Sequence, residues 1–189
     1  MILSVIILAA GQGTRMNSYI PKVFHEVGNQ PMIYHVLDLS QKLKAKSTTL
    51  VISKKLNNYK TSLLSKYQHI KFCYQNKQLG TGHAVLEASE NNEIKETDTT
   101  LVLYGDTPSM TFKTLNAALK DFGKKKLDLS VISMIVKDLN NSYGRLLIEK
   151  GKLIKIVEKT EQTNEEKKIQ LCNSGIMIIK SKHLFEKLK

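Results

Sequence analysis

The sequence predicts an α/β protein with a doubly wound, mostly parallel sheet and a small β-hairpin insertion. Up to Val136, short apolar runs alternate with segments of helical spacing, as expected where right-handed crossovers join parallel strands. Beyond Val136 the pattern changes to two short β-like segments around Gly151, which is typical of a hairpin.

The alternating part predicts strands and helices in turn. The first strand, Leu3–Leu8, is almost entirely apolar, as in a strand buried on both faces of a sheet. The expected strands are residues 3–8, 48–53, 70–74, 99–104 and 129–136, and the expected helices are residues 31–43, 57–67, a segment that begins near Thr81, and 111–122. Pro31 suits the first turn of its helix, and Thr81 is expected to cap the third helix. In the second helix, Leu63, Leu64 and Tyr67 are expected to face inward.

The C-terminal part predicts the hairpin and one further strand and helix. Its expected elements are strands at 143–148, 152–158 and 173–179, a surface loop or short helix at 160–168, and a helix that begins at Ser181. We find no internal repeat or linker, so one domain over residues 1–189 is expected. The helical pattern continues to Lys189, which predicts that this domain is incomplete at its C-terminus.

The composition argues against several classes of protein. The net charge of +12 comes mostly from dispersed lysines without interleaved aromatic residues, so no nucleic-acid partner is expected. The only arginines, Arg15 and Arg145, both lie in glycine-containing motifs, which suggests a need for bidentate geometry there. The first apolar run is too short to span a membrane, and Cys73 and Cys172 are expected to be buried reduced thiols of a cytoplasmic protein.

The segment after the first strand predicts a polyphosphate-binding loop. Small residues, including Gly11 and Gly13, allow close approach of the backbone to a ligand, and Arg15 and Lys22 supply positive charge. A plain strand-to-helix turn would explain the glycines but not the cations. No Walker A string occurs, and Met16 stands where a dinucleotide fingerprint requires its third glycine.

Other candidate residues follow later strands, at the sheet edge where ligands of open parallel sheets bind. Asp106 is expected to hold Mg²⁺ beside a polyphosphate, although an aspartate that opens a turn is the alternative. Gln75 could pair with a base edge or be a solvated loop residue. Glu158 could bind sugar hydroxyls or simply end its strand, and the turn at Gly144-Arg145 lies at the same kind of edge. His83 is expected to be a first-turn helix residue and not a base.

Six motifs occur in a characteristic order along the whole chain. They are LAAGQGTRM followed by Pro21-Lys22, QLGTGHA (78–84), YGD (104–106), YGR (143–145), IVE (156–158) and NSG (173–175). In this order they resemble the N-terminal domain of the bacterial bifunctional UDP-N-acetylglucosamine pyrophosphorylase/glucosamine-1-phosphate N-acetyltransferase family. The first motif is shared by many sugar nucleotidyltransferases, whereas QLGTGHA is much more specific to this family.

The resemblance implies a Rossmann-like nucleotidyltransferase fold and a Mg²⁺-dependent reaction. UTP and N-acetylglucosamine 1-phosphate would give UDP-N-acetylglucosamine and pyrophosphate for cell-wall (peptidoglycan) synthesis. By position, the implied catalytic residues are Arg15, Lys22 and Asp106, with Asp106 as the metal ligand. The implied substrate-binding residues are Leu8, Ala9, Ala10, Gly11, Gly13 and Lys22 for the nucleotide and its phosphates, Gln75, Gly80 and Thr81 for uridine, Tyr104, Gly105 and Asp106 in the cleft, and Gly144, Glu158 and Asn173 for the sugar.

The chain also departs from the family pattern. The family's uridyltransferase domain continues further and carries a second metal ligand, an asparagine, beyond the position of Lys189. The acetyltransferase β-helix is absent from the sequence, so neither acetyltransferase activity nor the trimer that this half provides is expected. Two alternatives stay open, a nucleotide-sugar-binding domain without turnover and a nucleotidyltransferase for another sugar phosphate or nucleotide.

Overall fold

The protein forms two compact units in a computed structural model, which describes residues 1–13, 16–186 and 188. The first unit comprises Met1–Ser130 and Met177–Lys189, and the second comprises Val131–Ile176. No helix within the described residues is both long and apolar enough to cross a membrane.

The first unit is built on a parallel sheet, as predicted. Strands β1 (Leu3–Leu8), β4 (Ser47–Ile52), β5 (Ile70–Tyr74) and β6 (Thr99–Tyr104) pair in parallel in the order β5-β4-β1-β6. All six residues of β1 are buried, which confirms the interpretation of the first apolar run. Residues Met177–Lys180 of β10 (Leu171–Lys180) extend this sheet by pairing antiparallel with β6, so the sheet is mostly parallel.

Helices and short turns connect these strands. The helices are α1 (Met32–Lys42), α2 (Lys60–Lys66), α3 (Thr81–Glu87), α4 (Phe112–Lys124) and α5 (Ser181–Leu184). Shorter elements are the 3₁₀ turns η2 (Lys22–Phe24), η3 (Lys54–Tyr59), η4 (Ala88–Glu90) and η5 (Asn92–Glu96) and the two-stranded ribbon β2 (Glu26–Val27) and β3 (Gln30–Pro31).

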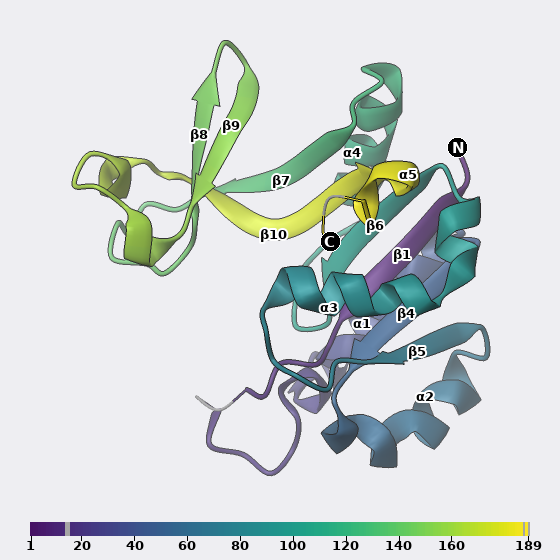
Figure 1. Cartoon of the computed structure of the whole chain (residues 1–189). Coiled ribbons are helices and arrows are strands. Elements are labelled where there is room, and N and C mark those ends of the chain that lie inside the picture. The colour runs from purple at the N-terminus through teal and green to yellow at the C-terminus, as the bar shows by residue number, and fades with distance from the viewer. Residues whose placement is uncertain (14–15, 187, 189) are drawn as a thin grey trace. The chain divides into compact units, whose positions relative to one another are not determined.

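The order of the strands places α1 and α3 on opposite faces of the sheet. From β1 the chain adds β4 and β5 on one side, then returns to add β6 on the other side of β1. Crossovers between parallel strands are right-handed as a rule, so the helices that precede β4 and β6 are expected on different faces of the sheet, and Figure 1 shows α3 in front of the strands and α1 behind them.

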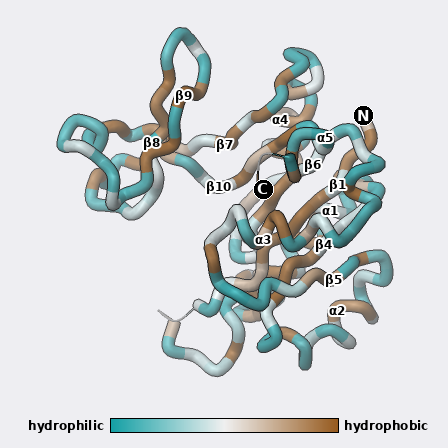
Figure 2. Tube along the Cα trace, viewed as in Figure 1, coloured by the Kyte–Doolittle hydropathy of each residue, from teal (hydrophilic) through white to brown (hydrophobic). Residues whose placement is uncertain are grey.

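The face under α3 and α5 forms a continuous apolar core. Its strands appear as hydrophobic stretches in Figure 2, while most of the connecting loops are hydrophilic. The buried residues of this cluster are Ile6, Leu8, Ala10, Val51, Cys73, Ala84, Val85, Ala88, Ile94, Val102, Leu184 and Phe185. This packing anchors the carboxyl ends of β1, β5 and β6, from which the candidate site is built.

The second unit contains the predicted hairpin. Strands β8 (Arg145–Glu149) and β9 (Lys152–Val157) pair antiparallel, and both residues of their turn, Lys150 and Gly151, have positive φ, as a type I′ turn requires. The N-terminal part of β10 pairs with β8 at Cys172 and Arg145. The polar segment after β9 forms two 3₁₀ turns, η6 (Lys159–Glu161) and η7 (Glu166–Lys168).

The strand predicted at residues 129–136 is present as β7 (Leu129–Ile135), which pairs with β10. Two predictions about the helices were wrong. Thr81 does not cap α3, because Gly80 occupies the N-cap position and Thr81 is the first helical residue. Leu64 does not face inward; 39% of its surface is exposed, because successive helical residues are rotated by about 100° and only Leu63 and Tyr67 share the buried face.

The adjacent leucines of α2 therefore provide a matched test of the fold. Leu63 is fully buried, so Leu63→Ala is expected to lower the free energy of unfolding by about 2–5 kcal/mol. Leu64→Ala is the control and is expected to change it by less than about 1 kcal/mol. Urea denaturation measures both variants, and equal destabilisation would contradict this placement of α2.

Candidate functional site

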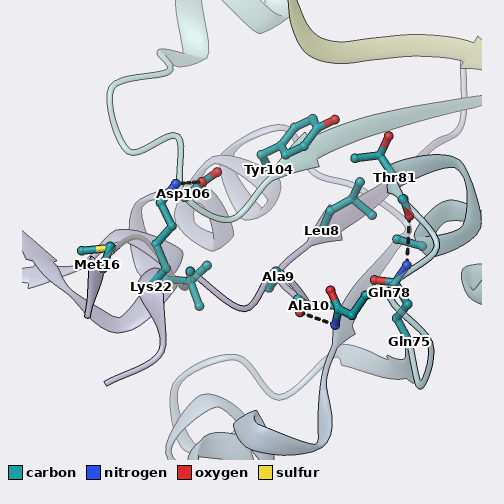
Figure 3. A pocket seen from close by; sticks show the side chains of 15 residues that line it. Leu8, Ala9, Ala10, Met16, Lys22, Gln75, Gln78, Thr81, Tyr104 and Asp106 are labelled. Atoms are coloured by element: carbon teal, nitrogen blue, oxygen red, sulfur yellow. Dashed lines mark hydrogen bonds and ion pairs between the residues drawn. The ribbon is translucent and has the colours of Figure 1, made fainter. Parts of the chain in front are cut away.

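A cavity of about 480 Å³ opens at the carboxyl ends of the strands of the first unit. Its walls come from the segments that follow β1, β5 and β6 and from the start of α3 (Figure 3). The chain adds β4 and β5 on one side of β1 and β6 on the other side. Ligands of doubly wound sheets bind beside such a reversal of strand order. The lining residues are Leu8, Ala9, Ala10, Gly11, Gly13, Met16, Lys22, Val23, Gln75, Gln78, Gly80, Thr81, Ala84, Tyr104 and Asp106.

Backbone hydrogen bonds hold the base of the cavity rigidly. The residue directly after each strand still donates to a neighbouring strand, namely Ala9 to Val51 O (2.8 Å), Gln75 to Ile52 O (2.9 Å) and Gly105 to Leu8 O (2.9 Å). The sheet therefore fixes the position at which each loop leaves it.

The loop after β1 depends on glycine at position 13. Gly13 has φ +61°, which disfavours other residues, and a Cβ there would lie 2.8 Å from Cβ of Lys22. The loop thus folds back so that Lys22 packs against Gly13. Lys22 itself begins η2 directly after Pro21, so its backbone is well defined.

Lys22 and Asp106 form an ion pair across the cavity. Nζ of Lys22 donates to Oδ2 of Asp106 at 2.5 Å, and Figure 3 shows the two side chains pointing toward each other. Both side chains are partly exposed, at 42% and 27%. Partly exposed ion pairs contribute little free energy, so a ligand with stronger charge can separate this one.

Two glutamines organise the opposite wall. Gln75 is buried and donates from Nε2 to Gly80 O (2.9 Å). Gln78 donates from Nε2 to Ala10 O (2.9 Å), and so ties the loop after β5 to the loop after β1 (Figure 3).

Most of the predicted site residues of the first unit gather around this cavity. Those that line it are Leu8, Ala9, Ala10, Gly11, Gly13, Lys22, Gln75, Gly80, Thr81, Tyr104 and Asp106. Gly105 is not among the lining residues. Arg15 and its neighbour Thr14 lie outside the described residues.

The remaining predicted residues lie together in the second unit. Gly144 O accepts a hydrogen bond from the backbone N–H of Asn173 (2.8 Å), and Oδ1 of Asn173 accepts one from Gly175 (2.8 Å). Oε1 of Glu158 approaches so closely that a Cβ at position 144 would lie 3.1 Å from it. A Cβ at position 144 would also lie 3.0 Å from Cγ2 of Ile156, so glycine suits this close contact.

Comparison with known protein families agrees with a nucleotide site at this edge of the sheet. The sequence of residues 5–169 matches the family described as the MobA-like NTP transferase domain. The chain belongs to this family. It is thus a nucleotidyltransferase domain, and the cavity at the edge of its parallel sheet is its candidate active site.

Two bacterial relatives are similar over nearly the whole chain. Bifunctional protein GlmU of Buchnera aphidicola subsp. Acyrthosiphon pisum (strain Tuc7) is 40% identical over 98% of this chain, and that of Buchnera aphidicola subsp. Baizongia pistaciae (strain Bp) is 37% identical over 96%. The chain spans only 39% of the length of each of these curated relatives.

Solved structures share the fold. A Bacillus anthracis protein assigned as a glucose-1-phosphate thymidylyltransferase superposes with a TM-score of 0.75 at 23% identity, covering 96% of this chain and 73% of the other. HddC from Yersinia pseudotuberculosis superposes with a TM-score of 0.70 at 26% identity, covering 97% and 79%. HddC has also been solved in complex with GMP-PN, with a TM-score of 0.68 at 25% identity over the same shares of each chain.

Gln78 lines the cavity of this NTP transferase domain but was not among the predicted site residues. Met16, Val23 and Ala84 also line the cavity without having been predicted. The signal for Gln78 was present, because it opens the QLGTGHA motif and lies in a loop at the carboxyl edge of the sheet. Its partner is a backbone oxygen 68 residues away, which only the fold reveals.

Asp106 is the residue of the transferase cavity best suited to hold a metal. Among the described residues no group of three or more histidine, cysteine, aspartate or glutamate side chains could hold a metal by themselves. A single carboxylate fits Mg²⁺, which keeps several waters and binds through one or two carboxylates and substrate phosphates.

Arg145 was expected at a ligand-binding turn, but it is a core residue of the second unit. Its side chain is completely buried, and Nη1 donates to Oδ1 of Asn141 (2.9 Å) and Sγ of Cys172 (2.7 Å), while Nη2 donates to Leu139 O (3.0 Å). Arg145 therefore holds the segment before β8 against β10, and its planar geometry satisfies neighbouring protein atoms.

Both cysteines are buried and unpaired, as predicted. Burial and the nearby carboxylates of Glu90 and Glu87 raise the pKa of the Cys73 thiol to about 11. The thiol is therefore protonated at neutral pH, which argues against a nucleophilic role.

The placement of Arg145 predicts a stability effect. Arg145→Lys keeps the charge but leaves part of the hydrogen bonding to Asn141 and Leu139 unmade, so it is expected to lower the free energy of unfolding by about 1–3 kcal/mol. Lys152→Ala, at an exposed position of β9, is the control. An Arg145→Lys variant as stable as the wild type would contradict this account.

Proposed function

We propose that this chain is a UDP-N-acetylglucosamine pyrophosphorylase domain. It transfers UMP from UTP to N-acetylglucosamine 1-phosphate, releases pyrophosphate and supplies UDP-N-acetylglucosamine for peptidoglycan synthesis in the cytoplasm. The main support is the 40% identity to a GlmU protein over 98% of the chain, together with the six ordered motifs.

The positions of the motif residues add a physical argument. One cavity is lined by motif residues that are distant in sequence, namely residues 8–11, Gly13, Lys22, Gln75, Gly80, Thr81 and Asp106. This cavity offers a glycine-containing loop, a cation and a carboxylate, which are the groups that a nucleoside triphosphate and its metal require. We assign Gly144, Glu158 and Asn173 to the sugar, because amide and carboxylate groups there can bind hydroxyl and acetamido groups.

In the proposed mechanism the protein positions two phosphates and offsets their charge. An oxygen of the sugar phosphate attacks the α-phosphorus of UTP, a new P–O bond forms, and the bond to the leaving pyrophosphate breaks. Nζ of Lys22 leaves the carboxylate of Asp106 and binds a phosphate oxygen instead. Arg15 binds the triphosphate. Gln75 contacts the base. No covalent enzyme intermediate or general base is needed, since positioning and electrostatics supply the rate enhancement.

Mg²⁺ bound at Asp106 would neutralise charge on the phosphates. Departure of Lys22 from Asp106 leaves a carboxylate oxygen available at the position where the triphosphate binds. Nucleotide binding is therefore expected to favour metal binding at Asp106. The Nζ group of Lys22 that leaves Asp106 then binds a phosphate oxygen of the substrate.

A second candidate is a transferase for another nucleotide or sugar phosphate. The complex of the HddC relative with GMP-PN favours it, since that protein is 25% identical to this chain. The higher identity to GlmU argues for the first candidate.

Pyrophosphate release tests the proposal. The purified chain is given each of UTP, CTP, GTP, ATP and dTTP with N-acetylglucosamine 1-phosphate, glucose 1-phosphate or mannose 1-phosphate, with and without Mg²⁺. Fastest release with UTP, N-acetylglucosamine 1-phosphate and Mg²⁺ is expected. Preference for another pair would support the second candidate, and UDP-N-acetylglucosamine binding without release would indicate a binding domain.

Asp106→Ala is expected to reduce Mg²⁺-dependent turnover at least about 100-fold, because the metal loses its carboxylate ligand. The variant should remain folded, since the side chain of Asp106 is partly exposed and its ion pair contributes little to stability. Steady-state kinetics and thermal melting measure the two effects. An unchanged rate would remove Asp106 from the mechanism.

Arg15→Lys is expected to lower kcat at least about tenfold, because a point charge cannot reproduce a bidentate contact with phosphate. The rate of pyrophosphate release at saturating UTP measures this effect. Full activity would mean that the guanidinium group makes no bidentate contact in the reaction.

A further inference from the structure

A chain of hydrogen bonds leads from helix α3 to the amide of Gln75. Oε1 of Glu87 lies 3.1 Å from Nε2 of His83, one turn earlier in the same helix. Nδ1 of His83 lies 3.3 Å from Nε2 of Gln75, which also donates to Gly80 O at 2.9 Å. His83 and Glu87 are only partly exposed, at 23% and 25% of their side chains.

The chemistry of these partners allows only one arrangement of the amide. A backbone carbonyl oxygen can only accept, so the amide atom beside Gly80 O must be the NH₂ group of Gln75. The same NH₂ group can only donate to His83, so Nδ1 of His83 must be the acceptor. The ring proton then lies on Nε2, from which it can be donated to Glu87.

This arrangement leaves the oxygen of the Gln75 amide for a ligand. Gln75 lines the cavity, and within the described part of the chain no hydrogen bond uses its Oε1. The group offered to a base is therefore an acceptor. Uracil and thymine present an imide N3–H donor, which matches this acceptor, whereas N3 of cytosine is itself an acceptor and would oppose it.

We propose that His83 and Glu87 are positioning residues that fix the amide of Gln75 so that the cavity selects a base with an imide N–H over cytosine. This inference rests on the proposed function, because it assumes that a nucleotide base reaches Gln75. Neither residue touches the base. Glu87 fixes the tautomer of His83, and His83 together with Gly80 O fixes the amide.

A purely structural role of the same contacts makes a different prediction. If His83 and Glu87 only stabilise α3, their loss weakens the binding of all nucleotides by the same factor. If they orient Gln75, their loss leaves the amide held by Gly80 O alone, so the amide presents its oxygen to the base less strictly, and the affinity for UTP falls relative to the affinity for CTP. The ratio of the two affinities separates these cases.

The test is isothermal titration calorimetry of the whole chain with UTP and with CTP, in Mg²⁺ and without sugar phosphate. The proteins are the wild type, His83→Ala, Glu87→Ala and Glu87→Gln. Glu90→Ala is the matched control, because Glu90 is an exposed carboxylate just beyond the same helix. Thermal melting establishes that each variant is folded.

We expect the wild type to prefer UTP and the preference to fall about three- to tenfold in His83→Ala, the effect of one hydrogen bond. Glu87→Ala should lose part of the preference. Glu87→Gln should keep it, because a glutamine oxygen still accepts from Nε2 of His83, and Glu90→Ala should match the wild type.

Two results overturn the inference alone. These are a wild type that binds UTP and CTP equally well, and a His83→Ala variant that binds both nucleotides more weakly at an unchanged ratio. Absence of UTP binding by the folded wild type contradicts the proposed function, and the inference falls with it.

Discussion

Between β1 and β6 the chain reverses the direction in which it adds strands to the sheet, and the candidate site depends on that reversal. Helix α1, which connects β1 to β4, covers one face of the sheet. Helix α3, which precedes the return to β6, covers the other face. The segments that leave β1 and β6 therefore diverge and leave room between them. Lys22 belongs to the segment that follows β1, and Asp106 belongs to the segment that follows β6. Their contact is therefore a consequence of strand order.

The polar groups of this site pair with one another. Lys22 is paired with Asp106, Gln78 with Ala10 O, and Gln75 with Gly80 O and His83. The two amide pairs lie on the wall that follows β5 and can stay in place when a nucleotide binds. The Lys22–Asp106 pair is partly exposed and weak, so phosphate and metal can replace it. The site thus combines a rigid wall with one exchangeable ion pair.

Local patterns in the sequence predicted much of the fold, whereas contacts between distant segments could not be read from them. The strands at Leu3–Leu8 and Thr99–Tyr104 were predicted correctly because strands buried on both faces are mostly apolar. The pairing of β7 with β10 was not predicted, since an apolar run does not specify its partner. The scarcity of arginine suggested a ligand-binding role for Arg145, but its partners Asn141 and Cys172 place it in a core. The motif residues identified most of the cavity wall, whereas the hydrogen bond of Gln78 to Ala10 O joins residues 68 apart, which only the fold reveals.

We expect a nucleotide to bind beside the reversal and to separate Lys22 from Asp106. A crystal structure of the chain with a non-hydrolysable UTP analogue and Mg²⁺ tests it most directly. We expect the base to lie beside Gln75 and the phosphates along residues 9–13, with Nζ of Lys22 on a phosphate oxygen and Mg²⁺ on Asp106. A nucleotide bound elsewhere, or one bound in the cavity with the Lys22–Asp106 pair intact, would contradict the account.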